Sequence, residues 1–153
     1  MKKDEILQHL RSAKQSHVRW VQSAKLLING MDISENSIPI NYTDCKFGKW
    51  FYSDAQMLHG LPNNPLESMS KIENLHMRLH DTYLKIFNVF FGKKRGFLSR
   101  LFNKKKNISQ EELEKAKKYY EELEQISKEL LEEINTLERR IIALAEKEIE
   151  KLV

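Results

Sequence analysis

The hexapeptide Leu75-His76-Met77-Arg78-Leu79-His80 lies in a segment, residues 66–91, whose apolar side chains recur every three or four positions. This period predicts an amphipathic helix with one buried face. Residues four apart lie on the same face of a helix, so His76 and His80 can converge on one metal ion. The inward stripe of this helix is expected to contain Met69, Ile72, His76, Tyr83, Phe87 and Phe90, with His80 beside it.

Three further segments show the same apolar period. In the last of them, Ser109 followed by Glu112 forms a capping box that marks a helix start. Four amphipathic helices with mostly modest connections predict an all-α four-helix bundle with a long C-terminal helix. We expect one domain over residues 1–153, with a basic connection at 93–107 and the C-terminal helix within 108–153. The expected helices cover residues 3–29, 44–58, 66–91 and 108–152.

Glycines and polar residues mark the expected helix ends. Gly30 and Gly92 follow the first and third helices, where a glycine commonly ends a helix. Thr43 or Asp44 is the expected N-cap of the second helix. Gly48, inside that helix, costs about 1 kcal/mol relative to alanine, which predicts a close approach to its backbone, for example by another helix.

The composition limits the class of protein. The chain has 153 residues, of which 41% are hydrophobic and 31% charged, and contains five glycines and three prolines. It has no apolar run of the roughly 18–20 residues that a membrane span needs, and its N-terminus lacks the apolar region of a signal peptide. We therefore expect a cytoplasmic protein. A single cysteine excludes an internal disulfide.

The net charge of +4 is unevenly distributed, because the stretch from Lys93 to Lys106 holds seven basic residues and no acidic one. Four large apolar side chains lie within it. The stretch could rest on an anionic membrane surface, bind an acidic partner, or form a loop over one end of the bundle. No nucleic-acid partner is expected, because the patch is short and no nucleic-acid motif accompanies it.

Two more metal-ligating residues occupy positions that the pattern directs inward. His17 lies on the apolar seam of the first helix, and Cys45 lies at the start of the second. With the histidine pair they supply three imidazoles and one thiolate, a complete tetrahedral set for Zn²⁺. Cu(I) and Co(II) accept similar ligands. The residues alone also allow a simpler interpretation, in which the cysteine fills the core and each histidine is satisfied by a hydrogen bond.

Three motifs carry a resemblance to a known family. The order His17-x-x-Trp20, Cys45-x-Phe47-Gly48-x-Trp50 and His76-x-x-x-His80 resembles the chemoreceptor zinc-binding (CZB) domain of bacteria. The resemblance extends to the closing helix through Ala116, Ser127, Leu130 and Leu137. It implies a four-helix bundle that commonly forms a homodimer, with Phe47, Gly48 and Trp50 supporting the cysteine. It also implies that the zinc ligands are His17, Cys45, His76 and His80.

The resemblance also sets expectations about partners. In the family this domain is usually fused to a chemoreceptor signalling helix or a diguanylate cyclase, and the sequence resembles neither. We therefore expect a free-standing bacterial module with a chemoreceptor or cyclase as signalling partner. The basic connection is longer than is usual for the family. A homodimer is also expected because the last helix should outreach its neighbours, with four apolar residues near its end: Ile141, Leu144, Ile149 and Leu152.

The ligand set favours sensing over catalysis. Four protein ligands leave no open position for substrate, and His76 is not followed by the glutamate of a zinc protease. We expect no enzyme. The expected function is a zinc-binding regulatory module that responds to oxidants such as hypochlorous acid, or to zinc, through its zinc-thiolate. The alternative is a structural or interaction protein in which zinc only staples the bundle and the last helix mediates oligomerisation.

Four other polar residues near these motifs allow more than one interpretation. His9 lies off the seam and is expected to face solvent. His59 lies in a turn and is expected to be either structural or exposed. Asp44 and Asp81 neighbour candidate ligands and could orient an imidazole, or could simply be solvated carboxylates. Three aromatic residues near these motifs are expected in the core: Trp20, Trp50 and Tyr83.

Overall fold

The computed structural model describes residues 2–31, 41–62, 65–92 and 108–152. This part of the chain is helical and contains no strand. The elements are α1 (Lys3–Ile28), α2 (Lys46–Phe51), the 3-10 helix η1 (Asp54–Gly60), α3 (Pro65–Phe91), α5 (Gln110–Ile142) and α6 (Glu146–Glu150).

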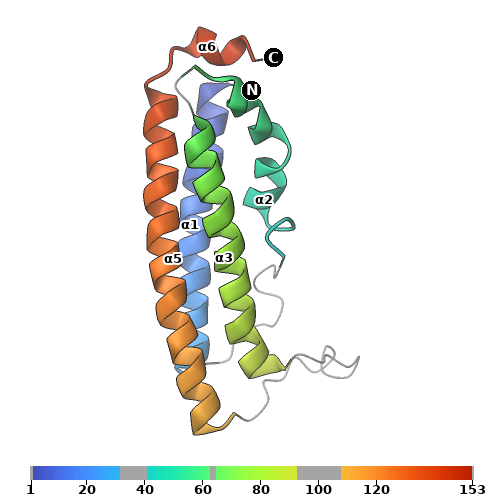
Figure 1. Cartoon of the computed structure of the whole chain (residues 1–153), viewed down its shortest axis with the longest axis vertical. Coiled ribbons are helices and arrows are strands. Elements are labelled where there is room, and N and C mark those ends of the chain that lie inside the picture. The colour runs from blue at the N-terminus through green and yellow to red at the C-terminus, as the bar shows by residue number, and fades with distance from the viewer. Residues whose placement is uncertain (1, 32–40, 63–64, 93–107, 153) are drawn as a thin grey trace.

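The three long helices lie side by side, and α5 packs against both α3 and α1 (Figure 1). The fourth position of the bundle is filled by two short elements, α2 and η1, which contact α1 and α3 respectively. Short α6 lies across the end of the bundle where α1 begins. The all-α prediction is therefore confirmed, with the fourth helix replaced by two short ones.

The core follows the apolar periodicity of the sequence. Every residue of the expected α3 stripe is at least nine-tenths buried, and so are the aromatic residues Trp50 and Tyr83, while Trp20 packs partly buried against the core. In α5 the buried positions include Ala116, Leu123, Leu130, Ile134 and Leu137. Burial of apolar surface on this scale, at about 25 cal/mol per Å², supplies most of the free energy that holds the helices together.

The helix ends agree in part with the expectations. Gly30 and Gly92 end α1 and α3 with φ angles of 83° and 81°, which disfavour residues with a Cβ. At the start of α5 the capping box is formed, because the Glu112 backbone N–H donates to Ser109 Oγ (3.1 Å) and the Ser109 N–H donates to Glu112 Oε1 (3.3 Å). These local signals are confirmed.

The second helix is shorter than predicted, so the expected helix over 44–58 is wrong. Helix α2 ends at Phe51, and η1 begins only at Asp54. Ser53 explains the break, because its Oγ donates to the Lys49 carbonyl at 2.6 Å and competes with the helical backbone. The N-cap is also different from the two predicted residues, since it is Cys45 itself.

The last helix is also shorter than predicted, because α5 ends at Ile142. Lys3 Nζ donates to the Ile142 and Leu144 carbonyls at 2.7 Å each, and the Lys3 N–H donates to Glu146 Oε1 at 3.1 Å. A cation on carbonyls at the C-terminal end of a helix is favourable for both charge and hydrogen bonding. The chain then turns back into α6.

Because of this turn, apolar residues near the end of the chain pack against their own bundle. Ile141, Leu144 and Ile149 are all more than nine-tenths buried within their own chain. The prediction that the last helix outreaches its neighbours and presents these residues near its end is therefore wrong, because α5 ends at Ile142 and α6 is a separate short helix. Dimerisation itself stays a prediction.

The basic stretch at 93–106 lies outside the described residues, so its three interpretations stay predictions. None of the helices in the described part has both the length and the apolar character that crossing a membrane requires.

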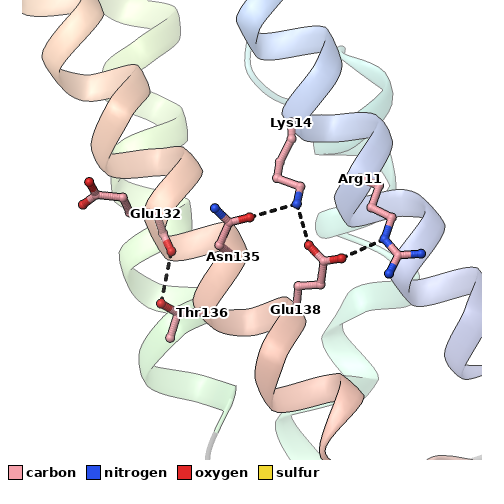
Figure 2. Close-up of polar contacts among 6 residues, drawn as sticks. All are labelled: Arg11, Lys14, Glu132, Asn135, Thr136 and Glu138. Carbon is pink, nitrogen blue, oxygen red and sulfur yellow. Dashed lines mark hydrogen bonds and ion pairs between the residues drawn. The ribbon is translucent and has the colours of Figure 1, made fainter.

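A cluster of polar side chains joins α1 to α5 (Figure 2). Lys14 Nζ donates to Glu138 Oε2 at 2.6 Å and to Asn135 Oδ1 at 2.8 Å, while Arg11 Nε donates to Glu138 Oε1 at 2.7 Å. Burial raises the pKa of the Glu138 carboxyl, but the hydrogen bonds from Lys14 and Arg11 outweigh this and leave its pKa below the usual value. These contacts fix the position of α1 along α5, about one turn before His17.

Candidate metal centre

Helix α3 presents two imidazoles to the interior. His76 and His80 lie one turn apart and are 0% and 2% exposed, and their Nε2 atoms are 3.2 Å apart. In the neutral state one ring can donate its proton to the other. With a metal bound, both nitrogens would instead direct lone pairs at the ion.

Cys45 brings its sulfur to the same point. Its Sγ lies 3.3 Å from His76 Nε2 and accepts a hydrogen bond from the Gly48 N–H at 3.2 Å. The sulfur thus serves as N-cap of α2, a position where a helix favours negative charge. Burial nevertheless raises the pKa of the Cys45 thiol, and the backbone hydrogen bond from Gly48 opposes this only in part. A cation is therefore needed to make the thiolate the dominant form.

Gly48 has a specific steric role beside the cysteine. A Cβ at this position would collide with the carbonyl oxygen of Tyr42. A close approach was predicted, but the approaching group is the loop before α2 rather than another helix. This lets the chain fold tightly around the Cys45 sulfur.

His17 is oriented by its own helix. Its Nδ1 donates to the Ala13 carbonyl at 2.6 Å, so Nε2 carries a lone pair and no proton. Nε2 is buried and has no hydrogen-bond partner within the described part of the chain. A buried imidazole fixed by a carbonyl at one nitrogen and unsatisfied at the other has the arrangement usual for a metal ligand.

The ligand atoms of the four side chains all lie within 4.8 Å of one another. A tetrahedral zinc ion would separate a sulfur and a nitrogen by about 3.5 Å and two nitrogens by about 3.3 Å, given its usual bond lengths. The contacts of 3.3 Å and 3.2 Å measured around His76 agree with these edges. Three helices contribute, and the members of this His₃Cys cluster are His17, Cys45, His76 and His80.

The electrostatics of the cluster also suit a cation. Burial lowers the pKa of His17 to about 4 and that of His76 to about 2, and the neighbouring histidines add to the effect. Both imidazoles are therefore neutral near pH 7, as metal binding requires.

Aromatic side chains enclose the cluster. The Phe47 ring packs against the rings of His17 and His76, with centroids 5.6 Å and 5.0 Å away. Trp20 packs edge-on against His17 at 4.6 Å and against His80 at 5.0 Å. These contacts exclude water and hold the imidazole planes.

One neighbouring residue differs from the expectations. His9 is partly buried and stacks on Trp50, with centroids 4.7 Å apart, so the prediction that it faces solvent is wrong. The sequence contained a signal, because residues 9, 13 and 17 follow one another at helical spacing. The same spacing marks Ala13, whose carbonyl orients His17 and which the sequence reasoning missed. His59 is exposed, as predicted.

The carboxylates near the ligands give no support for an orienting role. Asp44 and Asp81 are both exposed. The hydrogen bond that fixes the His17 ring comes from a backbone carbonyl.

Comparison with known families agrees with this geometry. Residues 17–87 match the chemoreceptor zinc-binding domain, and this segment contains the whole His₃Cys cluster. Residues 17–87 therefore form a chemoreceptor zinc-binding domain. Domains of this family take Zn²⁺ as their cofactor and serve in sensing and binding. In comparisons with curated proteins and with solved structures, nothing matched the chain significantly.

Proposed function

We propose that this protein is a zinc-binding sensory module of bacterial signalling, in which the His₃Cys cluster holds one Zn²⁺ and Cys45 is the group that responds. The observation that carries the proposal is the buried convergence of three imidazoles and one thiol, with no carboxylate among them. Four protein ligands close a tetrahedral site, which favours a structural or regulatory zinc over a catalytic one.

The residues of the chain prepare this site before a metal binds. Ala13 sets the tautomer of His17, and burial keeps His17 and His76 neutral. The Gly48 N–H directs the sulfur of Cys45 toward the histidines. Bound zinc would stabilise Cys45 as the thiolate, the form that oxidants attack.

The proposed response to hypochlorous acid is a two-electron oxidation of this sulfur. The thiolate donates an electron pair, gains the oxygen as a sulfenic acid, and chlorine leaves as chloride, so that RS⁻ and HOCl become RSOH and Cl⁻. Oxidation weakens the Cys45 contacts to His76 and to the Gly48 N–H. Because α2 has only six residues, loss of its N-cap is enough to loosen it from α1.

A sensor of zinc concentration would use the same residues. In that case loss of the ion, rather than oxidation, leaves the Cys45 sulfur without its cation. The two signals are separated by measuring whether oxidant changes zinc occupancy at constant free zinc.

The first experiment measures metal content in protein purified without chelator. Wild type is expected to hold about one zinc per chain, as one four-ligand site requires. The Cys45→Ala, His76→Ala double variant should hold little zinc, while His59→Ala, at an exposed histidine outside the cluster, should match wild type. Absence of zinc from wild type, or full retention by the double variant, would contradict the site.

The second experiment tests the response. Hypochlorous acid should release the zinc and change near-UV circular dichroism, and Cys45→Ala should abolish the oxidant-dependent part. If oxidant alters neither zinc occupancy nor helix packing, the alternative is favoured, in which zinc only staples the bundle. The burial of Cys45 at 1% exposure is the observation that supports this alternative.

The proposal includes cytoplasmic location, a homodimer, and a chemoreceptor or cyclase as signalling partner. The family resemblance supports these points. Size-exclusion chromatography with light scattering tests the dimer, and co-purification from a bacterial host tests the partner.

A further inference from the structure

A cavity of about 210 Å³ lies between α1 and α2 beside the His₃Cys cluster. Its polar lining comes from Gln8, Ser12 and Ser16 on α1 and from Lys46 on α2. Its inner wall contains His17 and Phe47. A single water needs about 10–15 Å³ of such volume, so the cavity has room for a small organic molecule or oxyanion.

The cluster itself is closed to solvent. Cys45 is 1% exposed, and His17 and His76 are 0% exposed. Any oxidant or chelator must therefore reach these atoms through a passage. His17 and Phe47 both line the cavity, and the Phe47 ring also packs on His17 and on His76, which lies deeper in the cluster and does not line the cavity.

We propose that this cavity is the access route to the metal centre, that the Phe47 side chain is its gate, and that Lys46 selects for small anionic reactants. The inference rests on the proposed function, because it concerns reactants of the same site. A rotation of Phe47 about its side-chain bonds would join the cavity to the cluster without unfolding α2.

The charge of the side chains that line the cavity favours the entry of anions. Lys46 is exposed where α2 begins, immediately after Cys45, and no carboxylate lines the cavity among the described residues. A single cation beside a low-dielectric cavity raises the local concentration of anions. Small carboxylate chelators fit this chemistry and this volume.

The experiment measures the rate of zinc release from the zinc-loaded full-length protein with two flat chelators of similar size. Dipicolinate is anionic and 1,10-phenanthroline is neutral. Ser12→Leu and Ser16→Leu fill the cavity from partly or fully exposed positions on α1, and each should slow release by both chelators several-fold. Gln22→Leu, an exposed position on α1 outside the cavity, is the matched control and should behave as wild type.

Two further variants test the gate and the charge. Phe47→Leu widens the passage and should speed release by both chelators. Lys46→Glu should slow release by dipicolinate more than by phenanthroline.

Several results would overturn the inference while leaving the proposed function intact. One is the finding that zinc-loaded Ser12→Leu and Ser16→Leu proteins release zinc at the wild-type rate. This is expected if reactants enter by unfolding of α2. Another is a Phe47→Leu protein that releases zinc no faster than wild type. If Lys46→Glu slows zinc release by both chelators equally, the selection for anions is rejected. Failure of wild type to bind zinc would instead reject the proposed function and the inference together.

Discussion

Replacing Gly48 with alanine is expected to damage both the fold and the metal centre, although alanine is the better helix former. The new Cβ would meet the Tyr42 carbonyl group, whose carbon lies 3.0 Å away, and Thr43 Cα at 3.2 Å. These are backbone atoms, so no side-chain rotation can relieve the contact.

The magnitude follows from two opposing effects. Overpacking of this kind typically costs about 1–3 kcal/mol, while the gain in helix propensity from glycine to alanine is at most about 1 kcal/mol. We therefore expect a net loss of up to about 2 kcal/mol in the free energy of unfolding of the zinc-free protein. Because Gly48 also donates to the Cys45 sulfur, displacement of α2 should lower zinc affinity by about 10–100-fold, as is common for groups that support metal ligands.

The assay combines urea unfolding of the zinc-free protein with competitive zinc titration. Lys49→Ala, at an exposed position next along α2, is the control and should change neither quantity appreciably. A Gly48→Ala protein that is more stable than wild type and binds zinc equally well would refute the reasoning, because helix propensity would then outweigh the contact with Tyr42.

Three further predictions concern pH, charge and stacking. The pKa values of His17 and His76 lie below the 6.5 of the unfolded chain, so between pH 6.5 and about 4 the unfolded state binds more protons. Stability of the zinc-free protein should fall as pH falls, by about 1.4 kcal/mol per histidine at pH 5.5; urea midpoints that are equal at pH 7.5 and pH 5.5 would contradict this. Glu138→Ala removes the partner of two basic side chains on α1 and should cost about 1 kcal/mol or less in urea unfolding, with the difference from wild type shrinking in high salt. His9→Ala removes the stacked ring pair and should cost about 0.5–1.5 kcal/mol beyond the lost buried area while changing tryptophan fluorescence; an unchanged emission spectrum would count against the stack.

The sequence predicted the long helices well because each has a continuous buried stripe. The apolar residues of α3 recur at helical spacing, so the periodicity located its buried face, and Gly92 marked its C-terminal end. Capping residues such as Ser109 acted locally, within one turn, and were therefore readable from sequence.

The two errors in helix length have long-range or side-chain causes. Ser53 breaks the second helix through a hydrogen bond to Lys49 that leaves no mark on apolar periodicity. The end of α5 depends on Lys3, which is 139 residues from Ile142 in the chain. Periodicity cannot report a contact of that separation.

The metal centre was predictable to different degrees. His76 and His80 form a pair by helix geometry alone. The convergence of His17 and Cys45 on that pair required a family resemblance, because spacing in the sequence does not fix the arrangement of helices. The roles of Ala13 and of the Tyr42 carbonyl are backbone contacts and carry no residue signature.

The contacts of Lys3 have a consequence for the order of events in folding and opening. They join the first turn of α1 to the end of α5 and the start of α6, across sequence separations of 139 to 143 residues. Contacts of such high separation form late, after the intervening helices have assembled. The two chain ends should then open as one cooperative unit, so that amide hydrogen exchange in the first turn of α1 and in α6 shows a common opening free energy.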